Sequence, residues 1–293
     1  MKNTFRMLVV VALGTMLFAS CKKEKLEGQY MPDKKLSVIR TANIDLSDDS
    51  ESFVSINTFH WDGKLLSDIE TTSGATGDGL SKNTFAYDSK NRVEKVTVET
   101  DVISTYKFIY TDKELTKVEG YFDSDEITDE YLFTRTDGKV TKITHHNYDG
   151  SLKKDDFKSL SFFFPEQIVT AMETASRVAN KDGEDEDVTT LIWEGDNIIK
   201  IELVSSATLT TDYTYDNKVN PLKDLYKGNF ESSPETLYSA NNILTTTTEM
   251  PFLGTITNTH TYEYDGDYPV KDVIEMNNSV IPSTKTVVTY TYL

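Results

Sequence analysis

Apolar and polar residues alternate along most of the chain, which is the pattern of strands with one buried face. In the segment 105–110, Tyr106, Phe108 and Tyr110 would share one face of a strand, while Lys107 would lie on the other. The alternating segments are also rich in Thr, Tyr, Val and Ile, which suit pleated, half-buried strands. The pattern therefore predicts a protein built from β-strands.

These segments belong to a repeat. Each copy has an aromatic-x-aromatic pair, a turn rich in Asp, Gly, Asn and Lys, and then an apolar residue followed by Lys or Asp and a β-branched residue. The copies begin at Phe59-His60-Trp61, Phe85-Ala86-Tyr87, Phe108-Ile109-Tyr110, Tyr131-Leu132-Phe133, Leu191-Ile192-Trp193, Tyr213-Thr214-Tyr215, Tyr262-Glu263-Tyr264 and Tyr290-Thr291-Tyr292. Because turn residues such as Asp-Gly tolerate positive φ, each copy predicts a β-hairpin.

The repeat predicts the fold class. At about 24 residues per unit, the region 53–293 holds roughly ten units, some degenerate, and roughly 16–20 strands. Open sheets of that size curl, split or close. We therefore expect an all-β fold, a large antiparallel meander of repeated hairpins curled into a flattened or partly closed barrel.

Three stretches interrupt the repeat. The segment 165–180 suits a short helix or a strand, and 181–187 reads as a solvated acidic loop. The segment 220–242 predicts a long connection with a helical turn at 222–226.

The first twenty residues have the pattern of a secretory signal. Basic Lys2 and Arg6 precede an apolar run, 7–18, and small residues follow it. The run is shorter than the ~20 residues that span a bilayer, so we expect cleavage rather than a permanent transmembrane helix.

Cys21 follows this signal and is the only cysteine in the chain. An exported protein with one cysteine forms no internal disulfide. Leu17-Phe18-Ala19-Ser20-Cys21 resembles the lipobox of bacterial lipoproteins, which implies that Cys21 is lipidated. The chain then divides into a signal peptide (1–20), a lipidated cysteine and tether (21–52) with at most a short strand at 36–40, and one repeat-built β domain (53–293).

Charge narrows the partners. The chain has 30 Lys and Arg against 48 Asp and Glu, a formal charge of -18, which argues against nucleic acid because phosphate binding needs clustered basic residues. By resemblance to lipoprotein sorting rules, Lys22 after the lipid-bearing cysteine implies delivery to the outer membrane, facing either the periplasm or the cell surface. The partners expected are the membrane, through the lipid, and a glycan or an envelope protein.

Candidate metal ligands are few. The turn aspartates Asp62, Asp88, Asp216 and Asp265 fit Asx turns better than calcium sites. His145 and His146 are neighbours on a strand and would point to opposite faces. His60 and His260 have no partner at ligand spacing in the sequence. We therefore assign no metal ligand and no cofactor.

Catalytic residues are not assigned either. The chain has no G-x-S-x-G motif. It has so many carboxylates that the presence of two that could act as a glycosidase pair is no evidence for that activity. Trp61 and Trp193 occupy regular repeat positions and are expected in the core. A stripe of lysines is expected on the outer face, where it would also blunt strand edges: Lys95, Lys117, Lys142 and Lys200.

A resemblance rests on Tyr215-Asp216-Asn217-Lys218, Asn220-Pro221-Leu222, and Ser239 with Asn241-Asn242-Ile243. The region 53–293 resembles an uncharacterised family of lipoproteins from Gram-negative gut anaerobes, described as a domain of unknown function with a porin-like β fold. It is loosely similar to tyrosine-aspartate repeats as well. The resemblance implies a fold and a location but no chemistry.

Three functions follow as hypotheses. The first is an outer-membrane-anchored, non-catalytic binding or scaffold domain. The second is a carbohydrate-active enzyme or glycan-binding accessory protein, and the third is an outer-membrane pore. Polar residues opposite the aromatics, such as Lys107, Asp212 and Glu263, disfavour a lipid-facing wall.

Overall fold

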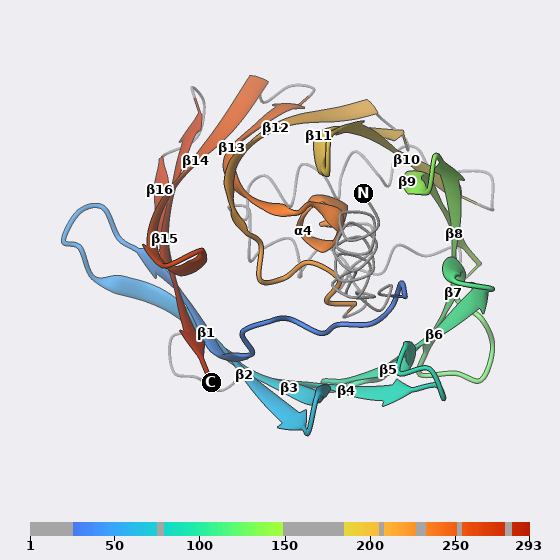
Figure 1. Cartoon of the computed structure of the whole chain (residues 1–293). Coiled ribbons are helices and arrows are strands. Elements are labelled where there is room, and N and C mark those ends of the chain that lie inside the picture. The colour runs from blue at the N-terminus through green and yellow to red at the C-terminus, as the bar shows by residue number, and fades with distance from the viewer. Residues whose placement is uncertain are drawn as a thin grey trace, which may run out of the picture.

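The protein is a single closed β-barrel. The computed structural model describes residues 26–74, 79–148, 185–204, 208–226, 233–250, 254–278 and 283–293. Their sixteen strands pair antiparallel in chain order, and the last strand pairs with the first (Figure 1). The predicted antiparallel meander is confirmed, and its strand number lies within the expected range.

The strands are β1 (Leu36–Ile44), β2 (Glu51–Asp62), β3 (Leu65–Gly74), β4 (Gly79–Tyr87), β5 (Val93–Glu99), β6 (Ile103–Thr111), β7 (Glu114–Phe122), β8 (Asp129–Thr136), β9 (Lys139–Asn147), β10 (Asp185–Glu194), β11 (Asn197–Val204), β12 (Thr208–Val219), β13 (Asn241–Met250), β14 (Gly254–Asp265), β15 (Tyr268–Asn278) and β16 (Thr284–Tyr292). One short helix, α4 (Pro234–Tyr238), lies between β12 and β13.

The apolar face of the wall points inward. Residues paired directly across neighbouring strands share a face, and Phe108 on β6 pairs with Val118 on β7. Both are buried in the core. The alternate pair, Lys107 and Glu119, lies on the outer face. The period-two pattern in the sequence thus records the two sides of the barrel wall.

A repeated hydrogen bond joins successive hairpins. In most hairpins a β-bulge follows the tight turn, and the second residue of the aromatic pair, or Arg135 in its place, donates to a main-chain carbonyl next to the bulge of the preceding strand pair. Tyr264 instead donates to the Asp216 carboxylate. The bonds are Trp61 to Leu36 (2.8 Å), Tyr87 to Leu66 (2.6 Å), Tyr110 to Val93 (2.8 Å), Arg135 to Leu115 (2.5 Å), Trp193 to Val140 (2.7 Å), Tyr215 to Ile198 (2.5 Å) and Tyr292 to Pro269 (2.8 Å). The repeat therefore encodes a ring of bonds around the barrel.

In one copy of the repeat, the aromatic residues indicate a start two residues before the structural one. The ring bond comes from Arg135, so the structural copy is Phe133-Thr134-Arg135 rather than Tyr131-Leu132-Phe133. Because Arg135 takes the place of the second aromatic residue, the aromatic pattern alone does not locate this copy.

Two segments fill part of the barrel interior, and we call their described residues the plug: residues 26–35, and 220–226 with 233–240, the second including α4. Figure 1 shows α4 and the chain before β1 inside the ring of strands. Tyr30 is buried, stacks on Trp61 with ring centroids 5.7 Å apart, and donates from its hydroxyl to the carbonyl of Pro221 at 2.8 Å. Tyr226 packs edge-on against Phe108. The plug therefore completes the hydrophobic core.

Polar contacts hold α4 in place. The Asn220 amide donates to the carbonyls of Thr236 (2.7 Å) and Ser239 (3.0 Å). The Ser239 hydroxyl accepts from the Ile198 amide at 3.1 Å and lies 3.1 Å from the Tyr215 hydroxyl. These bonds satisfy the polar groups of a helix too short to be stable alone.

The structure corrects three boundaries. The expected tether (21–52) contains β1, whose nine residues close the barrel between β16 and β2. The connection after β12 has turns at 221–224, and its helix comes later, at 234–238. Residues 185–187 of the expected acidic loop pair with β9 as strand. Closure also leaves no free sheet edge, so the lysine stripe has no edge to blunt.

Some expectations fall outside the described residues: the signal peptide 1–20, Cys21, the segment 165–180 and residues 181–184. None of the helices in the described part is both long and apolar enough to cross a membrane.

Candidate functional site

Three histidines each contact an aspartate that comes from a neighbouring strand. His60 on β2 contacts Asp68 on β3 on the outer wall. Inside the barrel, His145 contacts Asp129, and His260 contacts Asp272. Spacing along the chain reveals no partner for His60 or His260, because only the strand register brings the aspartates beside them. The contact between His260 Nδ1 and Asp272 Oδ2 is a hydrogen bond of 2.8 Å.

The His145 site is the most elaborate of the two inner sites. The Nε2 atom of His145 lies 2.9 Å from Asp129 Oδ1, and its Nδ1 atom lies 4.0 Å from Asp187 Oδ2. The Tyr131 ring stacks on the imidazole with centroids 4.4 Å apart and nearly parallel planes. The imidazole is thus placed between two carboxylates and against an aromatic face.

A glycine and a hydroxyl shape this site. Gly120 lies opposite Asp129 in the register, and a Cβ there would come within 3.0 Å of Asp129 Cβ and 3.5 Å of the Tyr106 ring. The hydroxyl of Thr128 donates to Asp129 Oδ2 at 2.8 Å. Asp129 is therefore fixed by two partners while Gly120 leaves room for it.

His146 follows in the chain but belongs to the outer face, where it pairs in register with Glu130. The opposite orientation predicted for the two neighbouring histidines agrees with this register. They do not share a site.

The His260 site is more deeply buried. Asp272 is 2% exposed, and its Oδ1 atom has no hydrogen-bond partner among the described residues. The Tyr262 ring stacks on the imidazole, and burial, with the nearby charge of Asp272, raises the pKa of the Tyr262 hydroxyl. Burial and the charge of Asp272 also raise the pKa of the Tyr290 hydroxyl. The site holds one carboxylate among phenols that stay protonated.

Polar pairs line the inner wall beyond the aromatic layer, away from the Asp-Gly turns. They are Thr71 with Asn57 (2.7 Å), Asn258 with Thr246 (3.0 Å), Thr286 with Asn43 (3.0 Å) and Thr211 with Thr248 (3.1 Å). The described interior thus has an apolar layer that packs on the plug and a polar layer of hydroxyls, amides and the His145 site.

The remaining predicted residues behave as structural groups. The Oδ1 atoms of Asp88 and Asp216 accept from amides two residues on, at Lys90 (2.8 Å) and Lys218 (2.9 Å), which confirms Asx turns at these two positions. Asp265 pairs with Lys34, and Asp62 closes the β2–β3 hairpin opposite Leu65.

The predicted core tryptophans and the predicted outer lysines also have places in the structure. Trp61 and Trp193 pack against the core and donate their ring N–H groups to the ring of bonds. On the outer face, Lys117 and Lys200 each contact a glutamate.

Comparison with known proteins supports the fold. No protein-family model and no curated protein matches the chain. A porin-like protein from Bacteroides uniformis is similar over 91% of this chain and 100% of its own, with a TM-score of 0.54 and 14% identity. A porin-like protein from Bacteroides vulgatus covers 89% of this chain and 99% of its own, with a TM-score of 0.25 and 10% identity.

The first similarity agrees with the porin-like fold implied by the sequence. At 14% identity this similarity supports the barrel fold alone. Lipoprotein membership and the likeness to tyrosine-aspartate repeats stay predictions.

Proposed function

We propose that this protein is a lipid-tethered binding or scaffold domain of the outer membrane, whose barrel stands in water. The observation that carries the proposal is the charge on the outer wall. Lys117 on β7 contacts Glu119 at 2.7 Å and Glu130 on β8 at 3.1 Å. Lys271 on β15 contacts Glu263 on β14 at 2.8 Å, at another part of the circumference.

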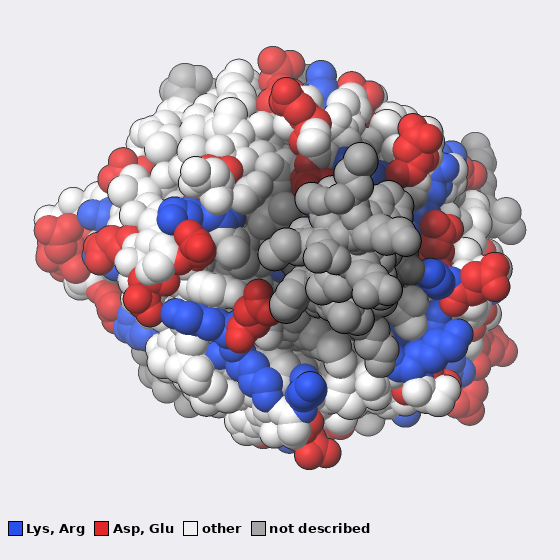
Figure 2. Space-filling view, viewed as in Figure 1, with Lys and Arg blue, Asp and Glu red and all other residues white. Residues whose placement is uncertain are grey.

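Such a wall suits water better than lipid. Transmembrane barrels carry an outward apolar band, and a basic residue at the bilayer midplane costs about 2–4 kcal/mol. Many outward positions here are threonines and charged residues of both signs, and exposed apolar residues such as Ile109 and Ile192 lie among them. Figure 2, which looks down the barrel axis, shows basic and acidic side chains interspersed around the rim at this end of the barrel.

The interior supports binding rather than conduction. Glu27 of the plug is bound to Arg135 on β8, and Tyr30 stacks on Trp61 of β2, so the plug is part of the packed core. Beyond it, the polar layer offers hydroxyls, amides and the His145 site, groups that recognise a small polar ligand such as a saccharide. The stacked Tyr131 adds an aromatic face next to them.

A pore is the second candidate function. The closed sixteen-strand barrel and the porin-like structural neighbour favour it. The two candidates differ in what surrounds the outer wall, which decides the experiment.

The experiment adds a charge to the outer wall. Thr97 on β5 pairs with Thr84 and Thr105, all three on the outer face, while its neighbour Val96 is fully buried inside. Thr97→Lys should leave the thermal midpoint and the yield unchanged if the wall meets water. The matched control Val96→Lys should prevent folding in either case, because it buries an unpaired charge.

Two readouts complete the test. The chain from residue 22, which contains every described contact, should be monodisperse in light scattering without detergent. The full chain should give no channel events in planar bilayers. Failure of Thr97→Lys to fold, detergent dependence, or stable channels would favour the pore. The binding role is then tested by measuring the binding of a panel of glycans to Asp129→Asn, which alters the His145 site, and to the outer-face control His146→Gln. Turnover of a glycan would instead identify an enzyme.

A further inference from the structure

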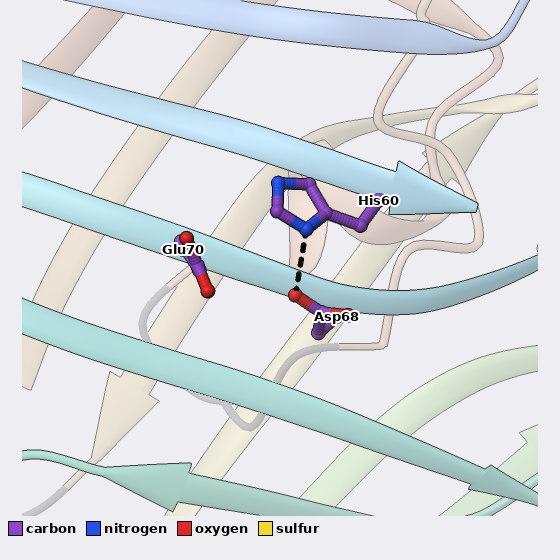
Figure 3. A group of neighbouring side chains, drawn as sticks. All are labelled: His60, Asp68 and Glu70. Carbon is purple, nitrogen blue, oxygen red and sulfur yellow. Dashed lines mark ion pairs between the residues drawn. The ribbon is translucent and has the colours of Figure 1, made fainter.

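A mixed nitrogen and oxygen cluster lies on the outer wall, outside the sites described above. Figure 3 shows His60 on β2 pointing toward Asp68 and Glu70 on β3. One ligand-type atom from each of the three residues lies within 4.8 Å of the others. The Asp68 side chain is 15% exposed, whereas those of His60 and Glu70 are 42% and 43% exposed, so the cluster is open to solvent on the outer wall.

A β-bulge creates the cluster. The turn pairs Asp62 with Leu65, and a regular ladder would bring Ser67 opposite His60. The bulge makes Ser67 the extra residue, so that Asp68 faces His60 instead. Glu70, two residues further along β3, then lies on the same outer face.

The second observation is an unsatisfied carboxylate oxygen. Asp68 Oδ1 is buried and makes no hydrogen bond among the described residues, and its contacts are ion pairs with His60 Nδ1 at 3.1 Å and Lys82 Nζ at 3.4 Å. Its other oxygen, Oδ2, lies 2.8 Å from the Ser67 hydroxyl, which fixes the orientation of the carboxylate. A nitrogen and an oxygen this close, without hydrogen-bond geometry, are suitably placed to share a third group.

The spacing fits a zinc-like ion. Zinc binds imidazole nitrogen and carboxylate oxygen at about 2.0–2.2 Å, so two ligand atoms of a tetrahedral site are roughly 3.3 Å apart. The separation of 3.1 Å between His60 Nδ1 and Asp68 Oδ1 is close to that value. The Ser67 contact to the non-ligating oxygen is the kind of outer support that ligating carboxylates have.

Lys82 on β4 supplies a cation to the same cluster. Its Nζ atom lies 3.0 Å from Glu70 Oε1 and 3.4 Å from Asp68 Oδ1. With two carboxylates and one ammonium the cluster has a net charge of -1. A divalent ion that displaced Lys82 would bring the charge to zero, and the long lysine side chain would move into solvent.

We propose that His60, Asp68 and Glu70 form a binding site for a zinc-like divalent ion, which enters by displacing Lys82. The imidazole supplies its Nδ1 lone pair, each carboxylate supplies one oxygen, and water completes the coordination from the solvent side. Because one of the ligands is an imidazole, calcium should bind far more weakly than zinc.

The test measures zinc binding to the full chain in chelator-free detergent, by equilibrium dialysis with elemental analysis. Wild-type protein should bind one zinc that His60→Gln and Asp68→Asn lose, with an affinity loss of about tenfold or more. Lys82→Gln should raise the affinity about tenfold, because it removes the competing cation. His146→Gln, another outer-wall histidine, should bind as the wild type does.

Cobalt gives an independent readout, since a tetrahedral nitrogen and oxygen site has characteristic visible absorption, which His60→Gln should abolish. Circular dichroism and the thermal midpoint without metal should be equal in all variants, which separates ligand loss from misfolding. Retention of the zinc in His60→Gln, weaker binding in Lys82→Gln, or binding seen only in Lys82→Gln would overturn the proposal.

Discussion

Arg135 on β8 holds both carboxylate oxygens of Glu27, 108 residues away, at 2.6 Å each. Glu27 also accepts from the Leu115 amide at 2.7 Å and from the Tyr226 hydroxyl at 3.2 Å. Burial raises the pKa of the Glu27 carboxyl, and the Arg135 charge opposes that shift. This one carboxylate therefore joins both plug segments to the barrel wall.

Replacing Arg135 with Met should destabilise the fold by about 3–5 kcal/mol, because it leaves the Glu27 charge buried without its partner. Urea unfolding followed by tryptophan fluorescence measures the change. The exposed pair Lys271 and Glu263 provides the control, and Lys271→Met should cost less than about 1 kcal/mol. Equal losses at the two sites would show that the plug contact contributes no more than a surface pair.

The ring of bonds predicts that removing one of its tyrosine hydroxyls destabilises the fold. Tyr87→Phe removes the 2.6 Å donor to the Leu66 carbonyl and leaves that acceptor partly buried. The expected loss is about 1–2 kcal/mol in the free energy of unfolding, measured in urea. Tyr148 is 52% exposed, so Tyr148→Phe should change stability by less than about 0.5 kcal/mol. Matching values would mean that the ring bonds are replaced by water without cost.

Strand positions could be predicted because inward aromatics and outward polar residues alternate. Closure was harder to predict. It depends on β1, whose inward residues include Thr41 and Asn43 beside Ile39, so its alternation is weak. The helix at 234–238 had a usable signal, since Pro234 and Glu235 follow Ser233 in the order that begins helices.

The histidine contacts could not be read from spacing. A regular hairpin would bring Ser67 opposite His60, and only the bulge replaces it with Asp68. Asp129 and His145 lie on neighbouring strands and make a diagonal contact that depends on the exact register of β8 and β9. Register and bulges are set by packing around the whole barrel, which the local sequence does not contain.

Backbone conformation predicts a further effect at Gly28. Gly28 and Gly63 both have positive φ, of 81° and 56°, so an alanine is strained at either position. Only at Gly28 would the new Cβ meet another group, the Tyr110 ring, with Cζ 2.7 Å away. Gly28→Ala should therefore lower stability by about 1–3 kcal/mol more than Gly63→Ala. Thermal and urea unfolding of the two variants measure the difference, and equal effects would contradict the close packing of Gly28 on Tyr110.

Cys21 predicts the attachment to the membrane. Full-length protein expressed in a Gram-negative host should begin at Cys21, carry acyl chains visible in the intact mass, and partition into the detergent phase. Cys21→Ala should lose the added mass and the partitioning, since several acyl chains at about 0.8 kcal/mol per buried methylene provide the anchor. An unmodified cysteine in the wild-type protein would remove the lipoprotein assignment.

Glu235 predicts a pH dependence of stability. It lies in the first turn of α4, and burial raises the pKa of its carboxyl from 4.5 to about 7, against opposing hydrogen bonds from its own backbone amide, Thr236 and Tyr213. The folded state therefore holds this proton more tightly than the unfolded state between about pH 4.5 and 7. Its contribution is fully present below pH 4.5 and is lost as the pH rises through 7, on the order of 1–3 kcal/mol.

Glu235→Gln should remove that part of the slope. The difference in unfolding free energy between the variant and the wild type, measured in urea at pH 4.5 and at pH 8, should favour the variant at the higher pH. Glu263→Gln, at a largely exposed position, should leave the slope unchanged. A slope that is the same in wild type and Glu235→Gln would mean that Glu235 is ionised in the folded protein at neutral pH, and that α4 tolerates the charge against β12.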